Sequence, residues 1–377
     1  MFRPYIIVFS ALLIANSSNI AAQSWEEEQH DISTSLGLNQ SDNLYNSLDQ
    51  KESAEYLFAG FDYDWLGLYE GFGVNLPFSV RSRYYQQQSQ LNGQDYELSP
   101  ALKLFLADAV DLTLNSHLSS QQLIAGNGAA EFVDRTKGAL TAEQKSLFAV
   151  LQLGRAPDKQ HLQLQIGHEI NQQHLQHQLL TELSSNVVRA EYAHRITENS
   201  ALLLHSEYRE EQQGFDDSRL RKIAGGWSGQ WVGRQQFSLL AGYFNRINGQ
   251  DEQTGLFWQL NNRWQLTQSW QLALSSSRLS VLSYASNSVS QLDTLHAISV
   301  EYAYSSAHQI GLTLAQRHSQ LDTVELKRSR LEAGLHWLWQ LNDRLQSRLQ
   351  LQQARQQDQA ESSHQRHELF WQLSWSW

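Results

Sequence analysis

The sequence predicts an all-β protein: a transmembrane, antiparallel, up-and-down β-barrel of about 18 strands, with 14–18 strands compatible with the pattern. Three observations lead to this fold class. Apolar and polar residues alternate with a period of two from residue 30 to the C-terminus. The joins between the alternating segments are short and long in turn, and aromatic residues gather at the segment ends. Strands, not helices, are therefore the expected membrane-crossing elements.

The composition excludes several classes of protein. The chain has 377 residues, a formal net charge of −11, no cysteine, 12 tryptophans and 14 tyrosines. The acidic balance argues against a nucleic-acid partner, because nucleic-acid-binding proteins normally carry a basic face. The lack of cysteine excludes a disulfide framework, a thiolate metal site and a thiol nucleophile. A mean hydropathy of −0.49 excludes a bundle of membrane-spanning helices. We expect neither a cofactor nor a metal.

Residues 1–22 are predicted to be a cleaved secretory signal peptide. Arg3 supplies a positive charge, residues 5–15 form a short apolar core, and Ala22 precedes the expected cleavage site. The apolar run is too short to span a bilayer, which takes about 20 residues. Residues 23–29 then form a short periplasmic segment, and residues 30–377 form a single barrel domain.

Each alternating segment is predicted to be one strand with an apolar face and a polar face, because successive side chains of a strand point to opposite sides. Most segments have about 9–14 residues, and a tilted strand needs about 9–11 to cross a bilayer. The segments are roughly 30–38, 54–65, 74–85, 95–106, 109–118, 144–154, 160–169, 186–195, 199–209, 219–231, 235–246, 254–264, 268–278, 294–304, 307–317, 326–339, 343–352 and 365–377. The residues expected to face lipid include Leu164, Leu204, Leu239, Leu274, Leu312 and Leu349; those expected inside include Gln165, Ser275 and Gln350. Pro77 has no N–H for the ladder, so we expect a bulge or weakened pairing there.

The joins and the aromatic residues orient the predicted barrel. The longest join is 119–143, and other long ones are 170–185, 210–218 and 247–253. Short turns on one side and long loops on the other are typical of outer-membrane barrels. An even number of strands places both termini on the short-turn, periplasmic side. Aromatic residues beside the short joins are Trp65, Tyr192, Trp231, Trp264, Trp270, Tyr304, Trp339 and Trp377, and those at the opposite ends are Tyr84, Tyr96, Tyr208 and Tyr243.

Two stretches resemble known barrels. Leu373-Ser374-Trp375-Ser376-Trp377 is similar to the aromatic-ended final strand of Gram-negative outer-membrane β-barrels, which the barrel-assembly machinery reads. This resemblance implies an outer-membrane location, with outer-membrane lipid, lipopolysaccharide and the assembly machinery as partners.

Residues 36–45 (LGLNQSDNLY) resemble the opening of uncharacterised barrel proteins associated with exopolysaccharide gene clusters. That resemblance implies a role in polysaccharide export or display.

The polar faces of the predicted strands supply the candidate site residues. A barrel lumen is polar, so charged residues on these faces are expected to line it. The candidates are Arg81, Arg83, Arg189, Glu191, Arg195, His205, Glu207, Arg209, Arg328, Arg330, Glu332, Arg344 and Arg348. Loop 119–143 is expected to fold into the barrel mouth, where its charged residues would narrow the lumen: Glu131, Asp134, Arg135 and Lys137. The alternative is a mobile surface loop.

The best catalytic candidate is the pair His117 and Ser119, which resembles the H-x-S of outer-membrane phospholipases and lipid-A deacylases. The Asn-Gly that follows in those enzymes is replaced by Ser120 and Gln121. The leucines around the pair form the apolar face, so His117 and Ser119 are expected to point into the lumen, away from a lipid substrate. His174 and His177 form an H-x-x-H without a carboxylate at ligand spacing, a weak zinc signal. We therefore expect no catalytic residue and no metal site.

Three functions are compatible with the pattern. A barrel of 16–18 strands leaves an aqueous lumen, which favours a porin-like conduit for a small solute or a polysaccharide. An accessory barrel of an exopolysaccharide export or assembly system shares every feature named above. An outer-membrane lipid-modifying hydrolase is the third alternative, and it lacks a convergent His/Ser/Asp set in the sequence.

Overall fold

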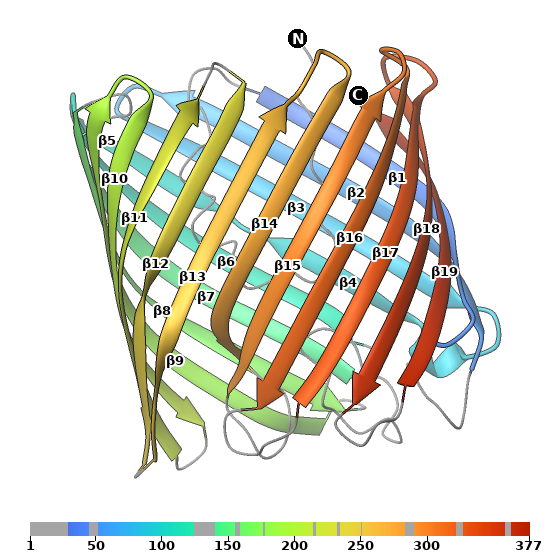
Figure 1. Cartoon of the computed structure of the whole chain (residues 1–377), viewed down its shortest axis with the longest axis horizontal. Helices are drawn as coiled ribbons and strands as arrows, with labels where there is room; N and C mark the ends of the chain where they lie inside the picture. The colour runs from blue at the N-terminus through green and yellow to red at the C-terminus, as the bar shows by residue number, and fades with distance from the viewer. Residues whose placement is uncertain are drawn as a thin grey trace.

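The computed structural model is a closed barrel, and Figure 1 shows its tilted strands running around a single wall. The structure describes residues 29–44, 52–123, 140–154, 159–175, 178–213, 216–231, 234–249, 251–282, 290–321, 327–358 and 363–377. Among these residues, 19 strands form one sheet in which chain neighbours pair antiparallel. Two of the strands, β4 and β5, are halves of one crossing, so the barrel has 18 strands. The predicted fold class and strand number are confirmed.

The strands follow one another around the barrel in chain order. They are β1 (Gln29–Ser41), β2 (Ala54–Tyr69), β3 (Phe72–Tyr85), β4 (Gly93–Leu98), β5 (Ala101–Ala107), β6 (Val110–Leu123), β7 (Leu140–Leu153), β8 (Gln160–Leu175), β9 (Gln178–Thr197), β10 (Ser200–Gln213), β11 (Asp216–Trp231), β12 (Gln235–Asn248), β13 (Asp251–Gln265), β14 (Trp270–Leu282), β15 (Ser290–Ala303), β16 (His308–Leu321), β17 (Lys327–Gln340), β18 (Leu345–Asp358) and β19 (Ser363–Ser376). A 3₁₀ turn spans Ser89–Leu91. In the described part of the chain, no helix is both long and apolar enough to cross a bilayer.

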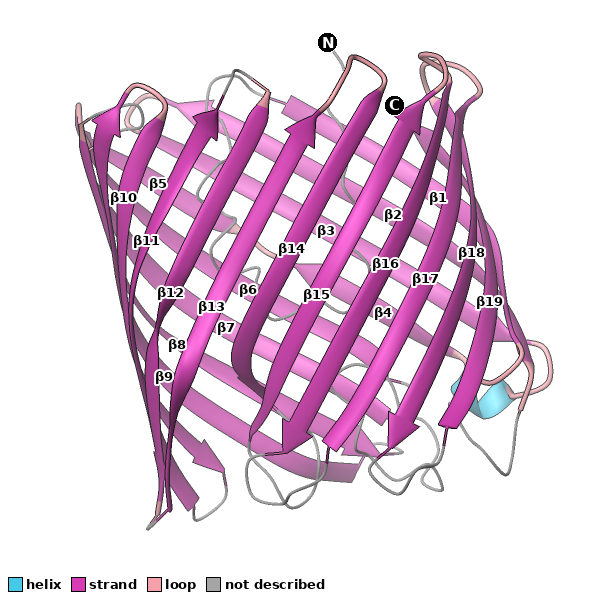
Figure 2. Cartoon of the chain, in the orientation of Figure 1, coloured by secondary structure: helices cyan, strands magenta, loops and turns pink. Residues whose placement is uncertain are grey.

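The first and last strands close the barrel. β1 pairs with β19 from Ser33 opposite Ser376 to Ser41 opposite Glu368. β1 starts and β19 ends at the same end of the barrel, beside the short turns coloured pink in Figure 2. We call this the turn end, and the opposite end the loop end. The predicted closure between segments 30–38 and 365–377 is confirmed.

Two prolines interrupt the fourth crossing. The pairing of β3 stops at Phe78 opposite Leu98 and resumes at Asn75 opposite Ala101, so the break between β4 and β5 keeps the register. Across the break, Ser99 N donates to Pro77 O at 3.1 Å and Ser116 N donates to Pro100 O at 2.9 Å. Neither proline has an N–H to donate to its neighbour. The weakened pairing expected at Pro77 is therefore present, and Pro100 contributes to it.

The strands extend further toward the loop end than the sequence suggests. The predicted loops 170–185, 210–218 and 247–253 are wrong, because β8 and β9, β10 and β11, and β12 and β13 are separated by only residues 176–177, 214–215 and 249–250. These stretches are rich in Gln, Asn, Glu and Asp on both faces. A ladder that projects beyond the hydrocarbon needs no apolar face, so its side chains lose the alternation that identifies a strand.

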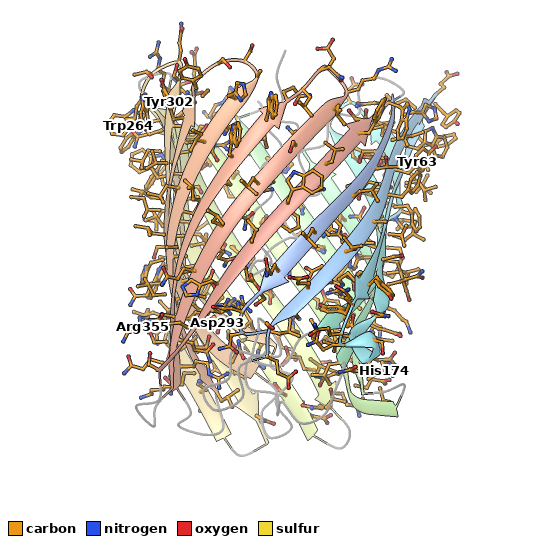
Figure 3. All side chains as sticks on the ribbon, turned by 90° about the vertical axis from the view of Figure 1, so that its right-hand side faces the viewer. Tyr63, His174, Trp264, Asp293, Tyr302 and Arg355 are labelled. Atoms are coloured by element: carbon orange, nitrogen blue, oxygen red, sulfur yellow. The ribbon has the colours of Figure 1, made fainter. Side chains whose placement is uncertain are left out.

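Outward and inward side chains alternate along every strand. The six leucines expected to face lipid lie on the outer face, with Leu204 as much as 58% exposed. Aromatic side chains gather on the same face near the turn end, where Figure 3 labels Tyr63, Trp264 and Tyr302. Trp337 and Trp339 stack there with centroids 5.9 Å apart. This arrangement matches the aromatic girdle expected at one membrane interface.

One glycine on the inner face makes room for a histidine. The His336 ring lies directly over Gly311 on the neighbouring strand, and a Cβ at position 311 would overlap it. We expect Gly311→Ala to lower the free energy of unfolding by about 1–3 kcal/mol, because the ring must move out of its rotamer. His336→Ala in the same chain should restore most of the loss. Gly225→Ala is the control, since nothing lies within 4 Å of that site. Denaturant unfolding in lipid vesicles gives the free energy of unfolding of the wild type, Gly311→Ala, Gly225→Ala and the double variant. A loss in Gly311→Ala that persists in the double variant would contradict the overlap.

Candidate functional site: the inner wall of the barrel

The inner wall carries twelve of the thirteen candidate residues predicted from the polar faces. The register places Arg81, Arg83, Arg189, Glu191, Arg195, His205, Glu207, Arg209, Arg328, Arg330, Glu332 and Arg348 on the face opposite the exposed leucines. Their part in transport belongs to the proposal below.

Arg344 does not line the wall, which corrects the prediction. It lies in the turn between β17 and β18 and is exposed. Asn342 Oδ1 accepts hydrogen bonds from the backbone N–H groups of Arg344 and Leu345, both at 2.9 Å. An asparagine that bonds the backbone two residues on stabilises a turn. The strand therefore begins one residue later than Arg344, at the turn end.

The largest inner-wall cluster spans β8 to β12. We call it the β8–β12 ion network; it consists of Glu169, Arg189, Glu207, Arg209, Glu211, Lys222 and Arg246. Its centre is Glu207, which accepts from Arg189 Nε at 2.9 Å and from Lys222 Nζ at 3.2 Å. Arg209 Nη1 lies 3.0 Å from Glu169 Oε2, and Arg246 Nη1 lies 2.7 Å from Glu211 Oε2. The network thus ties five strands together on the inside.

Burial makes these ion pairs more than surface contacts. The side chains of Glu207 and Glu211 are 5% and 1% exposed, and Arg246 is 5% exposed. Neutral groups complete the coordination: Gln165 Oε1 accepts from Arg189 at 3.1 Å, and Ser218 donates to Glu211 at 3.1 Å. A buried charge is tolerated when it is paired and hydrogen-bonded. The network therefore pairs each of its four cations with one of three carboxylates and keeps one excess positive charge on this part of the wall.

A second cluster lies on β15 to β19. Arg317 pairs with Asp293 at 3.3 Å, Arg366 pairs with Glu368 at 3.4 Å, and Arg330 contacts Glu332. Figure 3 shows Asp293 on the inner side of the wall and Arg355 on the outer side. On β3 to β6, Arg83 pairs with Asp95 and Lys103 pairs with Asp111.

The inner wall holds several charged residues that the sequence candidates missed. They include Asp95, Lys103, Asp111, Glu169, Glu211, Lys222, Arg246, Asp293, Arg317, Arg366 and Glu368. Counting along each strand would have found them, because a residue an odd number of positions from an outward-facing leucine points inward. Their strands reach further toward the loop end than predicted, so several of them stood in expected loops or at expected strand ends.

His117 and Ser119 lie on the inner face, as expected, and the structure adds a second serine. His117 Nε2 lies 3.2 Å from Ser119 Oγ, and His117 Nδ1 lies 2.7 Å from Ser99 Oγ at the break between β4 and β5. Glu97 is 3.8 Å from the ring, beyond hydrogen-bond distance. Both ring nitrogens are thus occupied by hydroxyls, and Ser119 is 8% exposed. A lipid-hydrolysing site would have to face the lipid, and this group faces the lumen.

The expected constriction residues cannot be placed. Glu131, Asp134, Arg135 and Lys137 lie in 124–139, outside the described residues. The join itself is shorter than predicted, because β6 runs to Leu123 and β7 begins at Leu140. Within the described residues, no group of three or more His, Asp or Glu side chains could hold a metal ion.

Comparisons with known proteins agree on the fold. No protein-family model and no curated sequence matches the chain. OccK2 (OpdF) of Pseudomonas aeruginosa has a similar structure, with a TM-score of 0.56, 11% identity, and 93% of this chain and 98% of that chain covered. The outer membrane protein OpdK of the same organism gives 0.52 and 11%, covering 93% and 99%. The FrpB iron transporter of Neisseria meningitidis gives 0.51 and 8%, covering 87% of this chain and 62% of FrpB. The chain therefore has the fold of Gram-negative outer-membrane β-barrels and spans less than two thirds of FrpB.

Proposed function

We propose that the chain is an outer-membrane, porin-like conduit for small polar solutes. The observation that carries this proposal is the inner wall of an 18-strand closed barrel, which is lined by charged and amide side chains. Barrels of 16–18 strands leave an aqueous channel, and a polar wall keeps water in it. In this proposal residues 1–22 are removed during export, and the turn end faces the periplasm.

The balance of charges on the wall supports a conduit of weak ion selectivity. Inner-wall arginines and lysines alternate with carboxylates, as in the pairs of Arg209 with Glu169 and Arg317 with Asp293. A single-sign wall would raise the local concentration of one kind of ion. OpdK has been solved with vanillate and OccK2 with glucuronate. These two small organic acids are reasonable first solutes to test on this protein.

Reversing one inner-wall charge should change the ion selectivity. Arg348 lies on the inner face of β18, and Arg344 lies four residues earlier in the exposed turn. In planar bilayers under a salt gradient, we expect Arg348→Glu to move the reversal potential toward cation selectivity. Arg344→Glu is the matched control and should move it less. Equal shifts in the two variants would show that ions do not pass close to Arg348. If the wild-type protein conducts no ions, the conduit proposal is wrong.

The exopolysaccharide function stays a second proposal, carried by residues 36–45 alone. The structure places 36–41 in β1 at the closing seam, where Leu36 and Leu38 face outward. Loss of secreted polysaccharide after deletion of the gene, in a protein that conducts no ions, would favour this function over the conduit.

A further inference from the structure

The pairing of β13 with β14 stops before either strand ends. Counted from the turn end, the two strands pair as far as Trp258 opposite Arg278, and no further among the described residues. Beyond this point β13 continues along β12 as far as Asp251, and β14 continues along β15. Figure 1 shows the lower end of β14 curving away from β13. At the loop end these two strands are therefore not joined by their own backbone ladder.

An apolar cluster lies on the inner face of the wall beside this interruption. Its buried members come from β11, β12 and β13, and they are Leu220, Ala224, Phe244 and Phe257. Phe244 lies opposite Lys222 of the ion network, and Phe257 follows the outward-facing Leu256, so both rings point inward. They are only 1% and 3% exposed. Apolar side chains inside a polar lumen are stabilised when other apolar side chains cover them.

Two leucines from β14 and β15 pack against the cluster, namely Leu279 and Leu292. The contact of Leu292 is not one that an even wall would make. Leu292 precedes Asp293, which points inward in Figure 3, so the alternation turns Leu292 outward. It also lies on β15, two strands from β13, and neighbouring strands are about 4.8 Å apart. Residues 279–281 and 291–293, which we call the β14–β15 tip, therefore fold in over the inner face of β13.

The burial of the β14–β15 tip agrees with this position. Ser280 and Val281 are consecutive residues on opposite faces of β14, and both are 7% exposed. Gln291 of β15 is 1% exposed. Further from the loop end the outer face of β14 is open, with Leu274 at 37%. A strand end that is covered on both faces fits a tip that has moved out of the wall and across the barrel mouth.

We infer that the β14–β15 tip is the constriction of the conduit at its loop end, held there by the packing of Leu279 and Leu292 against the apolar cluster. The inference rests on the proposed function and names the residues that limit solute size. Apolar packing is non-directional, so it can separate without breaking a row of backbone hydrogen bonds between β13 and β14. The tip can therefore move aside as one unit, as hinged segments of proteins do.

Cysteine cross-linking tests the position of the tip independently of transport. The chain has no cysteine, so only introduced thiols react. We expect a short bismaleimide to join Phe257→Cys with Leu292→Cys, detected by mass spectrometry of the cross-linked peptide. Leu256→Cys with Leu292→Cys is the matched control, because Leu256 is 64% exposed on the outer face of β13. An even wall would place Leu292 on the side of Leu256, so equal or preferential cross-linking of the control pair would overturn the inward fold.

Conductance in planar bilayers tests the constriction itself. Truncating a packed leucine costs at least the free energy of a tenfold change in an equilibrium, so Leu279→Ala/Leu292→Ala should raise the open population on the order of tenfold. The variant should also pass neutral oligosaccharides that the wild type excludes. Leu140→Ala/Leu183→Ala is the control, because these inner-face leucines are 0% and 7% exposed at the loop end of strands that are paired on both sides. It should conduct like the wild type.

The outcomes separate the constriction from the conduit. A conducting wild type that Leu279→Ala/Leu292→Ala leaves unchanged, or that both double variants change equally, would overturn the constriction alone. A silent wild type beside a conducting Leu279→Ala/Leu292→Ala variant would support a tip that closes the mouth. No conductance in any of the three proteins would overturn the conduit and the constriction together.

Discussion

Replacing Leu274 with arginine should lower the free energy of unfolding in lipid by about 2–4 kcal/mol, as lipid-facing cations do near the bilayer midplane. Leu274 is 37% exposed on the outer face, between the girdle residue Trp270 and the cation Arg278. Its neighbours in the cross-strand row are Ile298 and Leu314. On the other side, Asn262 of β13 lies opposite Leu274. It is neutral and offers an arginine no opposite charge, so most of the cost is that of a charge placed in hydrocarbon.

Ser275→Arg is the matched control for Leu274→Arg. Ser275 is the next residue in the chain and lies on the inner face, opposite Asn261 and Ala297. We expect it to lose much less stability, because its charge meets water and polar groups. Gln165 is a poorer control, since it already accepts a hydrogen bond from Arg189. Denaturant unfolding of both variants in vesicles decides the point, and equal losses would show that the two faces are assigned wrongly.

Glu207→Gln should cost about 3–5 kcal/mol, the usual penalty for removing one partner of a buried ion pair. Glu207 accepts from Arg189 and Lys222, and Arg209 lies 3.6 Å away. The variant keeps the shape of the side chain and leaves three cations without their shared carboxylate. The same vesicle assay measures the loss, with the strand pairing checked by circular dichroism.

Glu191→Gln is the control for the network. Glu191 is 36% exposed and pairs with His205 alone among the ion pairs of the described wall. We expect a loss well below that of Glu207→Gln, because an exposed pair contributes about 0–1 kcal/mol. If Glu207→Gln unfolds at the same denaturant concentration as the wild type, water must screen the charges of the network. The ion pairs would then contribute little to stability.

The sequence predicts the barrel well because one rule, the two-residue period, determines most of it. Parity alone assigns Leu312 to lipid and Arg330 to the inside, and the strand number follows from counting turns. The two-residue period does not identify the strand ends at the loop end, because residues 170–185 are polar on both faces. The two-residue period does not predict cross-strand partners either. The contact of Ser99 with His117, and that of Arg209 with Glu169 across the intervening β9, depend on register, which parity does not give.

The seam between β1 and β19 also determines when the molecule can be completed. Leu36 and Leu373 are partners across the seam although more than 300 residues separate them. Every other strand finds its neighbour soon after it is made, whereas β1 must wait with one edge open until the last residues arrive. The unpaired backbone groups at an open sheet edge can form hydrogen bonds with another chain. Substitutions at the seam should therefore reduce the yield of assembled protein more than they reduce the stability of the molecules that do assemble.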